Sequence, residues 1–99
     1  MRLNPDQIAA IHNAIGLVMP DVKAIRLFGS RLNDDARGGD IDLMVDIEHA
    51  IDRPALLSAR MATRVSRAIG NRQVDVVIRA PNLPETSIHK IALAEGIVI

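Results

Sequence analysis

Cysteine, tryptophan and tyrosine are absent from this chain of 99 residues, and phenylalanine occurs once, at Phe28. Without cysteine the chain can form neither disulfide bonds nor metal sites with thiolate ligands. With a single aromatic residue it has essentially no platform on which unpaired bases could stack. The composition therefore disfavours recognition of single-stranded nucleic acid.

An excess of charge of one sign is also missing, because 12 Lys and Arg residues balance 12 Asp and Glu residues. Binding to a nucleic-acid backbone usually requires a strong basic excess, so duplex binding is disfavoured as well. No apolar run approaches bilayer length, and the polar N-terminal segment has no signal-peptide core. These absences predict a soluble cytoplasmic protein without a membrane partner, and the length predicts a single domain over residues 1–99.

Hydrophobic periodicity predicts a small α/β protein in which strands are packed by helices. The predicted strands cover residues 24–28, 40–47 and 73–78. Helices are predicted over residues 5–18, over a stretch that Asp52 and Pro54 open and Gly70 ends, and over residues 84–95. His89 and Lys90 are expected on the polar side of the last helix.

Asp40 and Asp42 stand at the start of the second predicted strand, separated only by Ile41. Side chains alternate along a strand, so both carboxylates are expected on one face. Like charges this close need a cation or a proton to coexist, and Mg²⁺ is commonly held by carboxylates together with substrate phosphates. The pair would also fit a solvated edge strand, but the unbroken apolar register beside it favours a metal site.

Asp75 lies in the middle of the third predicted strand, among apolar residues. A carboxylate in that setting is costly unless it is paired or binds a metal. Asp75 is therefore the natural third ligand beside Asp40 and Asp42.

Small residues and arginines near these aspartates suit phosphate binding. Gly29 and Ser30 end the first strand, where backbone amides and a hydroxyl could face a phosphate. Gly39 gives the backbone room for close approach of a ligand. Arg31 and Arg37 could meet a triphosphate through their guanidinium groups, although Arg37 could equally pair with neighbouring surface aspartates.

The combination of Gly29-Ser30, Asp40-Ile41-Asp42 and the later Asp75 resembles the minimal nucleotidyltransferases of the DNA polymerase beta superfamily. The resemblance covers residues 25–78. It implies the polymerase beta-like nucleotidyltransferase fold, a small mixed, partly antiparallel sheet packed by helices. It also implies ATP as substrate and two Mg²⁺ ions as cofactors. The implied catalytic and metal-binding residues are Asp40, Asp42 and Asp75, and the implied nucleotide-binding residues are Gly29, Ser30, Arg31 and Gly39.

The acceptor of the nucleotide is left open by the residues, although a chain this short accommodates a macromolecular acceptor more easily than a small one. The resemblance implies an antitoxin that transfers AMP to a hydroxyl of a protein partner, a HEPN-type ribonuclease toxin. One alternative is an antitoxin that neutralises its partner by contact, with turnover incidental. Another is a nucleotidyltransferase that modifies a small molecule, of the aminoglycoside-modifying kind.

Three further features have two interpretations each. Arg60, Arg64 and Arg67 form a basic stripe on the second helix, which is either a solvated face or a surface for an acidic partner. Asp46 and Glu48 are interpreted as a solvated rim, with direct metal contact as the alternative. The apolar segment at residues 97–99 either packs locally or offers a contact edge.

Overall fold

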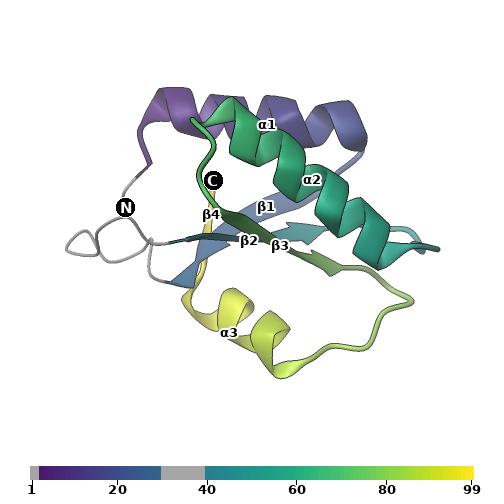
Figure 1. Ribbon diagram of the computed structural model, residues 1–99. Coiled ribbons are helices and arrows are strands. Elements are labelled where there is room, and N and C mark those ends of the chain that lie inside the picture. Colours follow the sequence, from purple (N-terminus) through teal and green to yellow (C-terminus); the bar gives the residue numbers. More distant parts are fainter. Residues whose placement is uncertain (1–2, 30–39) are drawn as a thin grey trace.

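A computed structural model describes residues 3–29 and 40–99, and within them it contains three helices and four strands (Figure 1). The helices are α1 (Pro5–Val18), α2 (Pro54–Ala68) and α3 (Ser87–Glu95). The strands are β1 (Ala24–Phe28), β2 (Ile41–Asp46), β3 (Val74–Arg79) and β4 (Ile97–Val98). The predicted fold class, a small mixed sheet packed by helices, is confirmed. None of the described helices combines the length and apolar character needed to span a lipid bilayer.

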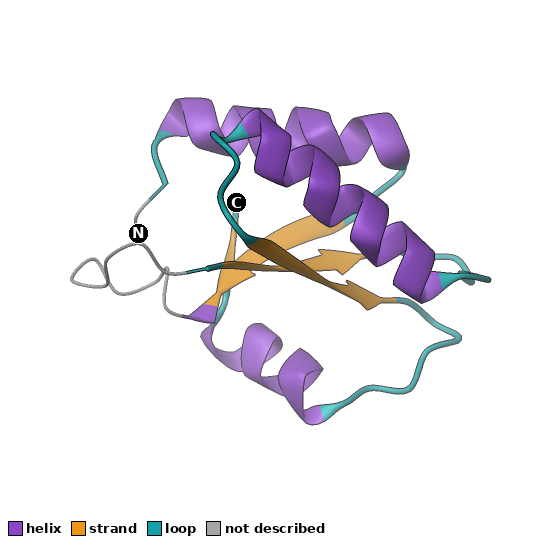
Figure 2. Ribbon diagram, in the orientation of Figure 1, coloured by secondary structure: helices purple, strands orange, loops and turns teal. Residues whose placement is uncertain are grey.

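The sheet has the strand order β3-β2-β1-β4. β2 runs parallel to β3 and antiparallel to β1, and β4 is antiparallel to β1. Parallel neighbours need a crossover connection, which α2 supplies here. As a result, the starts of β2 and β3 and the end of β1 meet at one end of the sheet, as Figure 2 shows. This is where the sequence predicts the functional site.

Helices cover both faces of the sheet, with α1 and α2 on one face and α3 on the other (Figure 1). Ile41, Leu43 and Val45 of β2 alternate toward the larger apolar cluster, which includes residues of α1 and α2. Met44 lies on the other face and joins Phe28 and Ala92 in a smaller cluster beneath α3. Because side chains alternate, Asp42 falls on the face that α3 covers only in part.

The predicted bounds of the first helix, residues 5–18, are confirmed, and a capping box explains where this helix starts. The backbone N–H of Gln7 donates to Oδ1 of the Asn4 side chain at 2.8 Å, and the backbone N–H of Asn4 donates to Oε1 of the Gln7 side chain at 3.0 Å. Two backbone donors that the helix leaves unpaired are thereby satisfied.

Asn4→Ala should lower the free energy of unfolding by about 1 kcal/mol, because one helix N–H loses its acceptor. Urea denaturation monitored by circular dichroism measures the change. Asn13→Ala, at an exposed position within the same helix, serves as the control and should cost nothing. Equal losses in the two variants would contradict the role of the cap.

The bounds of three elements differ from the predictions. The last helix begins at Ser87 rather than at residue 84, after a Thr86 cap. β2 covers Ile41–Asp46 rather than residues 40–47, and β3 covers Val74–Arg79 rather than residues 73–78. α2 begins at Pro54, one of the two residues predicted to open it.

The apolar segment at residues 97–99 joins the sheet, since β4 pairs Ile97 with Leu27 of β1, while the side chains of Ile97 and Val98 stay exposed. A strand of two residues has no periodicity from which it could be predicted.

His89 is buried, which corrects its predicted place on the polar side of the last helix. Its Nδ1 atom accepts from the Thr86 amide N–H at 2.9 Å, so the neutral ring carries its proton on Nε2. That nitrogen donates to the Ile78 carbonyl at 2.8 Å, and the Ser58 hydroxyl of α2 donates to the Val76 carbonyl. Both carbonyls belong to the edge strand β3, so these side chains cover part of its open edge.

Candidate functional site

Asp42 and Asp75 are direct neighbours in the sheet. The register of the parallel ladder pairs their Cα atoms, on strands whose usual spacing is about 4.8 Å. Asp42 is half-buried. Asp75 is exposed, because side chains alternate along β3 and Val74, Val76 and Ile78 face the core. Asp40 is exposed and immediately precedes β2. The three aspartates therefore gather at the start of two adjacent strands.

Gly29 comes to the same place from β1, because Phe28 pairs with Asp42 across the antiparallel ladder. Its φ angle is +77°, a conformation that residues other than glycine rarely adopt. A Cβ atom at this position would also collide with the Oδ2 atom of Asp42. Both the backbone angle and the position of the Asp42 carboxylate therefore favour glycine here.

The negative charge of this cluster is not compensated by the described part of the chain. Burial raises the pKa of Asp42, and the charges of Asp75 and then Asp40 raise it further. No described basic side chain forms an ion pair with any of the three aspartates. The donor set consists of carboxylate oxygens, the ligands that Mg²⁺ prefers, so these residues fit a divalent cation.

A complete metal centre is not preformed within residues 3–29 and 40–99, since no three acidic or histidine side chains there are arranged to hold an ion. Mutual repulsion of the carboxylates disfavours a tighter cluster when no cation is present. The predicted pair of Mg²⁺ ions stays a prediction.

Asp42→Asn should raise the melting temperature at pH 7 in the presence of a chelator. The pKa of Asp42 in the folded protein lies above its ordinary value of about 3.9, so the protonated side chain favours folding. This contribution is lost as pH rises through the raised pKa, and at pH 7 the charged side chain lowers stability. The advantage of the variant should therefore shrink as the pH falls toward about 4. Differential scanning fluorimetry measures both effects.

Asp52→Asn is the control for this experiment, because it removes an exposed charge outside the cluster. A lower melting temperature for Asp42→Asn at pH 7 would show that this carboxylate does not carry uncompensated charge.

Several predicted site residues lie outside the described residues. They are the predicted nucleotide-binding residues Ser30, Arg31 and Gly39, together with Arg37. Of the predicted nucleotide-binding set, Gly29 is the member whose surroundings the structure describes.

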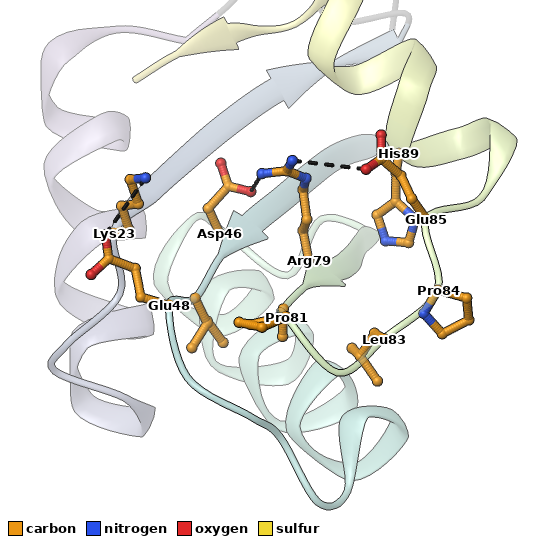
Figure 3. Close-up of a pocket in the computed structure, with 11 residues that line it drawn as sticks. Lys23, Asp46, Glu48, Arg79, Pro81, Leu83, Pro84, Glu85 and His89 are labelled. Atoms are coloured by element: carbon orange, nitrogen blue, oxygen red, sulfur yellow. Dashed lines mark hydrogen bonds and ion pairs between the residues drawn. The ribbon is translucent and has the colours of Figure 1, made fainter.

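A second polar cluster lies at the opposite end of the sheet and lines a cavity of about 610 Å³ (Figure 3). Asp46, predicted to lie on a solvated rim, is 5% exposed. Its carboxylate is 3.4 Å from Nε of Arg26 and 3.4 Å from Nη1 of Arg79, and Arg79 also reaches Glu85 at 3.8 Å. Two arginine partners explain why this aspartate is buried whereas Asp42 is only half-buried.

The sequence contains a signal for this cluster. Arg26 interrupts the apolar strand β1, and Arg79 ends β3 in the same strand phase as Asp75. Arginines at those positions of β1 and β3 indicate that the strand between them, β2, supplies a carboxylate to pair with them.

The comparison with protein families identifies the class of protein. The family model described as "Polymerase beta, Nucleotidyltransferase" matches residues 13–99, which include all four strands. The chain belongs to this family, and nucleotidyl transfer from a nucleoside triphosphate is the general activity that follows. A search of curated proteins found no match.

Proposed function

We propose that this chain is a Mg²⁺-dependent nucleotidyltransferase that transfers AMP from ATP to a hydroxyl group of a protein partner. The observation that supports it most directly is the pairing of Asp42 with Asp75 beside Gly29, in a chain of the polymerase beta nucleotidyltransferase family. Carboxylates that find no basic partner in the described part of the chain, at the start of two adjacent strands, suit a site that receives cations together with a triphosphate.

The proposed roles follow from position and charge. Asp40, Asp42 and Asp75 hold the divalent cations through their carboxylate oxygens. When bound, such ions neutralise phosphate charge and stabilise the attacking and leaving oxygens of an in-line displacement. Gly29 leaves room for the Asp42 carboxylate to lie against the backbone, which keeps this proposed metal ligand in place.

In the reaction, the acceptor oxygen forms a bond to the α-phosphorus of ATP while the bond to the bridging oxygen breaks, and pyrophosphate leaves. Asp75 is exposed on the edge strand β3, where a large acceptor can reach it without disturbing the sheet. We therefore assign Asp75 to positioning the hydroxyl and promoting loss of its proton. Ser30, Arg31 and Gly39 are proposed to contact the phosphates, with Ser30 on the outer ones.

The proposed partner is a HEPN-type ribonuclease toxin, for which this chain would be the antitoxin. The sequence resemblance to minimal nucleotidyltransferases supports this partner. The repulsion among these carboxylates at a half-buried position costs folding stability. An antitoxin that neutralises its partner by contact alone would not need them. The cluster therefore favours catalysis over a purely binding antitoxin.

Addition of Mg²⁺ and ATP should raise the melting temperature, because a ligand that binds the folded state stabilises it by mass action. A tenfold excess over Kd contributes about 1.4 kcal/mol, which corresponds to a rise of roughly 5–10 °C for a domain of this size. Asp42→Asn should lose most of the rise, and Asp52→Asn should keep it. An undiminished rise in Asp42→Asn would place the nucleotide and its metal elsewhere.

A further inference from the structure

α2 carries positive charge that the described residues do not neutralise. The helix contains three arginines and no acidic residue. Arg60, Arg64 and Arg67 are exposed, and no acidic side chain within residues 3–29 and 40–99 lies within ion-pair distance of them. Their spacing of four and three residues places them along one side of the helix.

The surface between these arginines and α1 is hollowed and has an apolar centre. Two adjoining cavities, of about 560 and 320 Å³, lie between α1 and α2, and Leu17, Arg64 and Arg67 line both. Leu17 is 68% exposed, although it belongs to a helix that packs in the core. We call this surface the arginine groove, and it consists of Leu17, Arg60, Arg64 and Arg67 with the two cavities.

Charge and shape together indicate what the groove fits. A solvated basic face would account for the arginines alone, whereas here Arg64 and Arg67 border two cavities together with the exposed Leu17. A nucleic-acid backbone would match the arginines but would leave that leucine against phosphates and sugars. Protein interfaces combine arginine with an apolar centre, and an amphipathic helix lays its apolar face into such a groove.

We propose that the arginine groove docks an acidic, amphipathic helical segment of the protein that receives the nucleotide. The proposal rests on the proposed function, since it takes the acceptor to be a protein. α1 and α2 cover one face of the sheet (Figure 1). Asp42 and Asp75 lie on the other face, because they alternate with strand residues that join the larger apolar cluster. Docking at the groove therefore leaves the aspartates free for nucleotide and acceptor hydroxyl.

Three variants of the full chain test the groove. Arg64→Glu reverses the charge that borders both cavities, and Leu17→Ser removes the apolar centre without changing charge. Lys90→Glu is the matched control, because it makes the same reversal at an exposed position of α3. The exposed sites leave the core intact, and circular dichroism with thermal melts verifies the fold of each variant.

The probe is the purified protein encoded beside this chain's gene, titrated calorimetrically, with adduct formation followed in parallel. Arg64→Glu and Leu17→Ser should each weaken binding about tenfold, whereas Lys90→Glu should bind like the wild type. Wild-type binding should also weaken as salt rises from about 50 to about 300 mM.

Wild-type affinity in both groove variants, with the adduct still formed, would overturn the groove and leave the proposed function intact. Absence of both binding and adduct with the wild type would instead overturn the proposed function and the groove with it. Tighter binding of a 16-base-pair RNA duplex than of the protein would overturn the choice of a protein occupant.

Discussion

Asp75→Asn should reduce nucleotide transfer by about 100-fold or more, while much of the affinity for ATP remains. Loss of a residue that only hydrogen-bonds to a metal ligand typically lowers activity by about 10–100-fold. Loss of a proposed direct ligand should lower it by at least as much. Asp40 and Asp42 would still hold the cation that accompanies the triphosphate. The loss should therefore fall on kcat, because the interaction matters chiefly in the transition state.

Transfer of label from ATP labelled at the α-phosphate to the partner protein measures the rate, and fluorimetry with Mg²⁺ and ATP measures the binding. Asp75 is exposed, so the substitution should leave the fold intact. Asp52→Asn again serves as the control. Wild-type kcat in Asp75→Asn would exclude this aspartate from the catalytic set.

Gly29→Ala should lower transfer about 100-fold with only a modest loss of stability. The methyl group would occupy the position of the Asp42 carboxylate, which must then move away. Displacement of a reacting group by 1 Å can cost about 100-fold in rate. The positive φ angle adds a stability cost of about 1–2 kcal/mol for any residue with a Cβ atom.

The chain offers matched controls for this substitution. Gly70 has a φ angle of +87°, but a Cβ atom there meets nothing within 4 Å. Gly70→Ala should therefore lose the same 1–2 kcal/mol or so and keep full activity. Gly16→Ala, within α1 and in open space, should gain about 0.5–1 kcal/mol. Equal activities in Gly29→Ala and Gly70→Ala would show that contact with Asp42 is unimportant.

Local patterns in the sequence predicted the parts of the site that depend on neighbouring residues. Hydrophobic periodicity predicted the bounds of α1, and the place of Asp75 among apolar residues of a strand predicted that its carboxylate is set apart from the core. Neither pattern contains the strand order. The pairing of Asp42 with Asp75 depends on a parallel register between segments 33 residues apart, which α2 establishes through packing.

Two of the wrong predictions concern polar residues whose partners come from distant segments. Asp46 is buried because Arg26 and Arg79 reach it from two other strands. His89 is buried because the edge of β3 presents a carbonyl that its ring can satisfy. Hydropathy assigns such residues to the surface, since it takes no account of a partner that offsets the cost of burial.

Mass spectrometry of the partner protein after incubation with Mg²⁺, ATP and this chain tests the central claim most directly. The wild type should leave an adenylyl group on a hydroxyl side chain, Asp75→Asn should leave none, and rescue of growth from the toxin should be lost in the same variant. Full rescue by Asp75→Asn without any adduct would contradict catalysis and leave neutralisation by contact.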